Sequence, residues 1–166
     1  MKKIYAIAVL LLVTVGASAQ EGRNIYNRYS DTEGVSAVYI SPAMFKLIGR
    51  IPELNVEIGE GENMDLAPLV RTFSGFYMLD IENPSVGTEL LREVDSMIRK
   101  GRYELLMEVK DDGDTVRIYT AGNDNTIESI VFIASEQDET QFMCLDGTMN
   151  RSDVESLIAK AAASSM

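Results

Sequence analysis

Six acidic residues fall in two predicted turns, and their side chains are the chain's best candidates for binding a metal ion. Asp111-Asp112-Gly113-Asp114 has the composition of a tight hairpin turn, and a second acidic turn follows further along the chain. The first and third turns of an antiparallel meander lie at the same end of its sheet, so the two groups should meet there. Carboxylate oxygens suit Ca²⁺, and the candidate ligands are Asp111, Asp112, Asp114, Glu136, Asp138 and Glu139.

A solvated surface is the competing interpretation of these six acids, and we prefer it. Asp and Gly are common in turns for conformational reasons alone. The spacing Asp-Asp-Gly-Asp also differs from the EF-hand loop. We therefore assign no metal ligand from the sequence and keep the six acids as a candidate site to be tested.

The absence of histidine is the most informative feature for catalysis. It excludes Ser–His–Asp and Cys–His mechanisms and most zinc and haem sites. Cys144 is flanked by hydrophobic residues and has no His to activate it, so we interpret it as a buried thiol. The sequence contains neither a phosphate-binding glycine loop nor a dinucleotide motif, and no Trp to line a sugar cleft. These observations predict a protein that is not an enzyme and has no cofactor.

The N-terminus has the layout of a secretory signal peptide over residues 1–19. Lys2 and Lys3 precede an apolar stretch of about twelve residues, and small residues follow, so we predict cleavage between Ala19 and Gln20. Spanning a bilayer takes roughly twenty apolar residues, which favours a cleaved leader over a retained anchor. We expect a mature chain without a membrane span, located in the periplasm or outside the cell.

The mature chain would be strongly acidic. The full sequence of 166 residues has a net charge of −11, and removal of the two lysines in the leader gives −13 for the remaining 147 residues. Such a charge repels nucleic acids and anionic lipid headgroups, which excludes both as expected partners. The length fits a single domain with a hydrophobic core.

The elements that would hold these side chains begin after a polar segment. Residues 20–34 are rich in turn-forming residues and predict a flexible lead-in to a single domain over 35–163. A strand at 35–40 precedes a helix that Ser41 caps and Pro42 begins. The acidic segment 53–65 predicts a surface loop, and a short helix follows it.

The second half of the domain has the clearest periodicity. A strand at 76–81 leads through Asn83 and Pro84 into a long amphipathic helix, which Gly101 is expected to end in a left-handed conformation. Alternating segments then predict a four-stranded antiparallel meander, whose first strand is half-buried. Ser152 and Glu155 form a capping box for a last helix. The predicted meander strands are 103–110, 116–120, 127–135 and 140–145.

These elements predict an α+β fold with the order β-α-α-β-α-β-β-β-β-α. The four-stranded meander and one or two further strands would form a sheet covered by helices. The strand at 127–135 is apolar on both faces, so a second layer of helices from residues 42–73 must cover one face unless a ligand does.

Several blocks of the sequence resemble the domain of unknown function 4252 family, small exported proteins of Gram-negative gut-type bacteria. The most specific block is Tyr103–Asp114, and the similarity spans roughly residues 35–160. The resemblance implies export, a single domain and placement in the bacterial envelope, and it implies no activity or catalytic residue. The supporting blocks are Val38–Ser41, Gly75–Leu79, Glu82–Pro84 and Leu145–Asn150.

Two functional hypotheses follow. The first is a non-catalytic envelope protein that binds another envelope protein or modulates signalling. An exposed strand edge or an uncovered apolar sheet face would be its binding surface. The alternative is a small-molecule carrier that holds its ligand between a curved sheet and the long helix.

Overall fold

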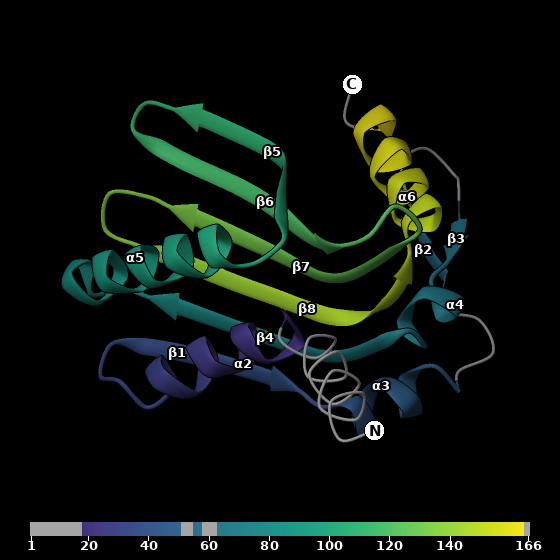
Figure 1. Ribbon diagram of the computed structural model, residues 1–166, viewed down its shortest axis with the longest axis horizontal. Coiled ribbons are helices and arrows are strands. Elements are labelled where there is room, and N and C mark those ends of the chain that lie inside the picture. The colour runs from purple at the N-terminus through teal and green to yellow at the C-terminus, as the bar shows by residue number, and fades with distance from the viewer. Residues whose placement is uncertain (1–17, 51–54, 58–62, 165–166) are drawn as a thin grey trace, which may run out of the picture.

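The computed structural model describes residues 18–50, 55–57 and 63–164, which form one large sheet with helices on it (Figure 1). Residues 1–17, with most of the predicted signal peptide, lie outside the described residues. So do 53, 54 and 58–62 of the predicted acidic loop. The elements are α2 Ser18–Tyr29, β1 Val35–Ile40, α3 Pro42–Ile48, β2 Asn55–Glu57, β3 Asn63–Asp65, α4 Ala67–Val70, β4 Phe73–Ile81, α5 Pro84–Lys100, β5 Tyr103–Asp111, β6 Asp114–Gly122, β7 Thr126–Ser135, β8 Thr140–Asn150 and α6 Arg151–Ser164.

Six strands form the main sheet in the order β1-β4-β8-β7-β6-β5, and every neighbouring pair is antiparallel. The α+β class and the meander of β5 to β8 are therefore confirmed, with β4 and β1 extending the sheet beyond β8. The order differs in detail, because β2 and β3 form a small separate sheet within the predicted acidic loop and α2 precedes β1.

Helices α2 and α5 lie together on one face of the sheet, which we call the core face (Figure 1). Asn83 caps α5 as predicted, since its Oδ1 accepts hydrogen bonds from the amides of Ser85 and Val86. The apolar stripe of the helix then packs against the middle of the sheet. The buried members of this cluster include Leu90, Val94 and Met97 from α5 and Leu79, Val131 and Phe142 from the sheet.

The expected flexible lead-in over residues 20–34 is wrong for its first ten residues, which are helical in α2. Ile25 and Tyr29 are buried in the core, and the Tyr29 hydroxyl donates a hydrogen bond to Glu93 on α5 at 2.9 Å. Gly22, Ile25, Tyr26 and Tyr29 follow helical spacing, but three large hydrophobic residues within a mostly polar segment give a periodicity too short to stand out. The folded domain therefore begins before residue 35.

Two predicted helix ends also need correction. Gly101 has φ −86° and ψ 177°, which is extended rather than left-handed backbone. Helix α6 is capped by Asn150 rather than by the predicted box, because the Ser152 amide and hydroxyl both donate to Asn150 Oδ1. The sequence therefore predicted the position at which α5 ends but not the backbone conformation of Gly101, and it placed the cap of α6 two residues too late.

The second face of the sheet carries an apolar row that crosses all six strands in register. Helices α3, α4 and α6 gather at one end of the sheet, where Phe45 of α3 contacts Phe73 and Val154 of α6 is buried (Figure 1). Away from that end the row is half-buried, and its outermost members are 45–46% exposed. The row runs through Val38, Met78, Met143, Phe132, Ile118 and Met107.

Within the part of the chain that the structure describes, no helix is both long and apolar enough to cross a membrane.

Candidate functional site

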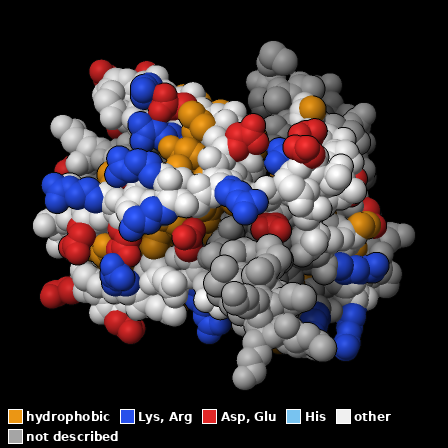
Figure 2. Space-filling view, viewed as in Figure 1, with side chains coloured by type: hydrophobic (Ala, Val, Ile, Leu, Met, Phe, Trp, Pro, Cys, Tyr) orange, Lys and Arg blue, Asp and Glu red, His pale blue; other side chains and the backbone are white. Residues whose placement is uncertain are grey.

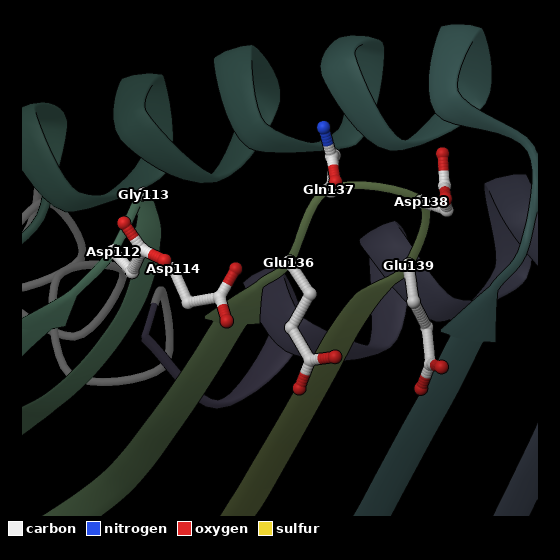
Figure 3. A pocket seen from close by; sticks show the side chains of 7 residues that line it. All are labelled: Asp112, Gly113, Asp114, Glu136, Gln137, Asp138 and Glu139. Carbon is white, nitrogen blue, oxygen red and sulfur yellow. The ribbon is translucent and has the colours of Figure 1, made fainter.

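The two acidic turns meet at one end of the sheet, as their sequence positions predicted. Asp112 and Gly113 form the β5–β6 turn with φ of 45° and 101°, the left-handed values that a two-residue hairpin requires. This turn and the β7–β8 loop line a surface pocket of ≈ 630 Å³ (Figure 3). The lining residues are Asp112, Gly113, Asp114, Glu136, Gln137, Asp138 and Glu139.

The acids at this pocket do not form a coordination shell among the residues described. Asp111, the sixth candidate, does not line the pocket. Asp138 and Glu139 point to opposite sides in Figure 3, and Glu139 Oε1 already accepts a hydrogen bond from Gln141 at 2.6 Å. No three acidic or Cys side chains in the described ranges are grouped to hold a metal ion. The arrangement gives a negatively charged end of the sheet and supports no specific ion.

Asp80 is an acid near this end that sequence reasoning missed. The β4–β8 register pairs it with Gln141, close to Glu139. Burial raises the pKa of Asp80, and the nearby Glu139 carboxylate raises it further. An acid within the otherwise apolar Phe76–Ile81 segment was the available signal, but only strand pairing reveals its neighbour.

A second polar group is buried under α2 on the core face. Cys144 is fully buried, its thiol donates to Asp146 Oδ1 at 3.4 Å, and Ser129 Oγ lies 3.4 Å from its Sγ. Burial is the main cause that raises the Cys144 pKa well above its usual value, with Asp146 adding to it. The thiol therefore stays protonated, which agrees with the interpretation of Cys144 as a buried thiol and not a nucleophile.

Asp146 is the most unusual member of this group. It is 2% exposed, and its Oδ2 finds no hydrogen-bond partner within the described parts of the chain. Burial raises its pKa to about 6, while Ser129 and Cys144 oppose the rise. Glu21 of α2 and Tyr103 of β5 approach the same group, and burial raises the pKa of each. Because burial disfavours the charged form of Asp146, its ionisation affects the stability of the fold.

Strand β5 forms an open edge of the sheet. Eight of its nine residues are exposed, and Leu105, Leu106, Met107 and Val109 are 41–49% exposed. A bulge between Leu105 and Met107 shifts the register with β6. In Figure 2, hydrophobic side chains lie between charged ones in the region of the β5–β6 hairpin, above α5.

The charged side chains of β5 are arranged around Glu108. Its carboxylate pairs with Arg117 Nε of β6 at 2.6 Å and with Lys110 Nζ at 2.9 Å. These two cations lower the pKa of Glu108, Lys110 being the larger influence. Glu104 lies farther along the strand and pairs with Arg151 at 3.7 Å.

The family of the chain follows from a sequence comparison. A family model described as "Domain of unknown function (DUF4252)" matches residues 29–157, which include all six strands of the main sheet. The chain belongs to the DUF4252 family. The resemblance noted in the Tyr103–Asp114 block is thereby confirmed, and the buried Asp146 and the open β5 edge both lie within the DUF4252 match.

Other comparisons add little to the DUF4252 assignment. No curated protein matches this chain. Among solved structures, the solution structure of cyanobacterial PsbP (CyanoP) from Synechocystis sp. PCC 6803 is similar with 16% sequence identity, covering 82% of this chain and 88% of that chain. Its TM-score of 0.30 is too low to support any statement about the DUF4252 fold or its function.

Proposed function

We propose that this DUF4252 chain is an exported, non-catalytic envelope protein that binds another protein by strand addition to β5. The observation that carries the proposal is the open edge of β5, a nine-residue strand whose last eight residues are exposed. An unpaired strand edge presents a row of free N–H and C=O groups, and strand addition uses them to bind an extended segment of a partner.

The hairpin turn fixes which backbone groups of β5 face the open edge. Asp111 and Asp114 flank a two-residue turn, so they exchange hydrogen bonds with each other. The backbone N–H and C=O groups of successive residues point to opposite sides of a strand, so Val109 and Met107 also form backbone hydrogen bonds with β6. The backbone groups of Lys110 and Glu108 therefore point away from β6 and are available to a partner strand.

The opposite edge of the sheet is a poorer binding surface. Strand β1 has only six residues, and Tyr39 stacks on Tyr77 with ring centroids 5.3 Å apart. Tyr26 of α2 also contacts Tyr39, with centroids 6.1 Å apart. These ring contacts hold one face of β1, whereas β5 is exposed along its length.

Export and the absence of catalysis complete the proposal. The N-terminal layout of Lys2, Lys3 and an apolar stretch supports secretion to the periplasm or beyond. The lack of His and the buried, protonated Cys144 support a role without catalysis. Mass spectrometry of the protein expressed with its leader should find a mature chain that begins at Gln20. An intact Met1 would contradict export by a cleaved leader.

The binding experiment compares two substitutions at one position. Lys110→Pro removes an outward N–H without breaking a bond to β6, since proline is tolerated at such edge positions. Lys110→Ala removes the same side chain and keeps the N–H, so it is the matched control. We expect wild type and Lys110→Ala to capture the same protein from an envelope extract, and Lys110→Pro to lose it. Equal capture by all three variants would contradict strand addition at β5.

The carrier alternative lacks a supporting observation. It places a ligand between the sheet and α5, but Leu90 and Val94 of α5 are at most 2% exposed there and pack in one cluster with Leu79 and Phe142. A ligand would have to displace this core.

A further inference from the structure

The charge pattern of β5 indicates what kind of strand fits beside it. We propose that the partner is a second copy of this chain, and that two β5 edges pair antiparallel about a two-fold axis at Val109. The two six-stranded sheets would then join into one. This inference rests on the proposed function, because it names the partner of the same edge.

Backbone geometry restricts where the two-fold axis can lie. In an antiparallel pair, two opposing residues either both point their backbone N–H and C=O groups toward each other or both point them away. A residue opposite its own copy meets this condition, whereas a residue opposite a copy of its chain neighbour does not. The two-fold axis must therefore lie at a residue and not between two residues. The bulge between Leu105 and Met107 interrupts the alternation on one side, and the turn at Asp112 ends the strand on the other. The axis positions between these limits are Glu108, Val109 and Lys110.

Charge selects among the three positions. An axis at Glu108 places that carboxylate opposite its own copy, and an axis at Lys110 does the same to the ammonium group. Like charges directly opposite destabilise strand pairs, and opposite charges stabilise them. An axis at Val109 puts Glu108 opposite Lys110 of the second copy, and by symmetry it does so twice. Two copies of the segment Glu108-Val109-Lys110 that run in opposite directions therefore place opposite charges beside each other.

The same register also satisfies the backbone and the apolar side chains. Glu108 and Lys110 are the residues whose backbone groups face outward, so both charged pairs are also hydrogen-bonded pairs. Val109 meets its own copy on the opposite face of the sheet, where Val116 and Ile118 lie beside Val109 and Met107. Both Met107 and Val109, now 45% and 48% exposed, would be partly covered. The apolar second face would run through both copies.

A disulfide experiment tests this register directly. Val109 and its copy would form a non-hydrogen-bonded pair with Cα atoms about 4.5 Å apart, within the range of about 4.4–6.8 Å that a disulfide accepts. Met107 would lie opposite Asp111 of the second copy, which puts the two Met107 positions roughly 13 Å apart. The native Cys144 is fully buried, so the wild-type chain serves as the blank.

Under a mild oxidant, we expect mature Val109→Cys protein to convert to a disulfide-linked dimer, and Met107→Cys protein to form no disulfide between copies. Equal cross-linking of the two variants, preferential cross-linking of Met107→Cys, or no cross-linking of either would overturn the proposed register.

Charge reversal provides a second test by sedimentation equilibrium. Lys110→Glu and Glu108→Lys should each be monomeric, because residue 108 of one copy would then face a residue 110 of the same charge in the other copy. An equal mixture of the two should form a heterodimer, in which every charged pair is again opposite. Lys46→Glu makes the same charge change on exposed α3 and should remain as dimeric as wild type. Loss of the dimer in Lys46→Glu, or no association in the mixture, would contradict pairing through Glu108 and Lys110.

The outcomes separate this inference from the proposed function. If the wild-type chain sediments as a monomer at all concentrations while Lys110→Pro, but not Lys110→Ala, loses a different protein from the envelope extract, self-pairing is refuted and strand addition stands. If the chain is monomeric and Lys110→Pro captures the same proteins from the envelope extract as wild type, both self-pairing and strand addition at β5 are refuted. A dimer that Lys110→Ala weakens, through loss of the charged pair with Glu108, and that Lys110→Pro abolishes, through loss of the outward N–H as well, supports both.

Discussion

Replacing Asp146 by Asn should remove a pH dependence of stability that the buried carboxyl imposes on this fold. The side chain lies under α2 at 2% exposure, with Cys144 donating to Oδ1 and no described partner for Oδ2. A charged carboxylate in such a place is poorly compensated, so the folded state favours the protonated form. Asn keeps the shape and cannot ionise.

The magnitude follows from the pKa in the folded and unfolded chains. Burial raises the pKa of Asp146 from 3.8 to about 6, and each unit corresponds to about 1.4 kcal/mol, so ionisation costs the folded state about 3 kcal/mol once it is complete. Below the unfolded pKa of 3.8 both states are protonated and the cost vanishes. Between the two pKa values the folded state binds more protons than the unfolded state, so stability falls as pH rises through about 6.

The measurement is urea unfolding of wild type and Asp146→Asn across this pH range. The Asn amide adds a donor that is itself unpaired beside Oδ2, at a cost of about 1–3 kcal/mol, so the absolute stability at one pH is not decisive. The decisive quantity is how the difference in unfolding free energy between the two proteins changes with pH, because the other carboxyls titrate in both proteins and cancel in that difference. Asp146→Asn should gain about 3 kcal/mol relative to wild type between about pH 3 and pH 7. A difference that does not change with pH would refute the buried, uncompensated carboxylate.

Three further predictions concern the elements around this group. Gly22→Ala puts a Cβ against Cys144 Sγ and should lower the free energy of unfolding by about 1–3 kcal/mol, with a smaller loss in a Cys144→Ala background; equal losses in the two backgrounds would rule out the clash. Asn83→Ala removes both cap hydrogen bonds of α5 and should cost about 1 kcal/mol in chemical denaturation, while Asn83→Ser retains most of the stability. Cys144 should react with a thiol reagent only after urea unfolding, and labelling of the native chain at the rate of a free thiol would show that α2 does not stay on the sheet.

The sequence predicted best those elements whose signal is local. The alternation from 103 to 145, the Asp-Gly turn and the Asn83-Pro84 helix start each depend on neighbouring residues. The meander and α5 are confirmed, although β8 runs five residues past its predicted end at 145. Helix α2 was missed because its polar residues dominate a short segment and its few buried side chains acquire meaning only from the sheet they contact. Tertiary packing, rather than propensity, makes that segment helical.

The candidate site was predictable in position but not in environment. The meander alone brought the two acidic turns together, so their meeting at one end of the sheet was predicted, but the pocket between them was not. Cys144 and Asp146 are two residues apart on one strand and must share a face, yet the sequence does not show that α2 covers that face. The raised pKa of Asp146 depends on that cover, and therefore on a helix in a segment whose composition predicted a flexible lead-in.

For strand β5 the sequence predicted burial that the structure does not show. Its alternation predicted a half-buried strand, but the bulge at Leu106 places Leu105 and Met107 against successive residues of β6, and every residue of the strand after Tyr103 is exposed. Alternation shows which side chains share a face, and a strand needs a covering element before that face is buried.

An open, partly apolar edge would promote aggregation unless its pairing is limited. The bulge and the turn confine regular pairing to residues 107–111, and the charges of Glu108 and Lys110 disfavour the neighbouring registers. A two-fold pair at Val109 uses the β5 edge of both copies and leaves only their β1 edges open, where Tyr39 is held by Tyr26 and Tyr77. Pairing through β5 would therefore close at two copies, which explains how this edge can remain apolar without forming a continuous sheet.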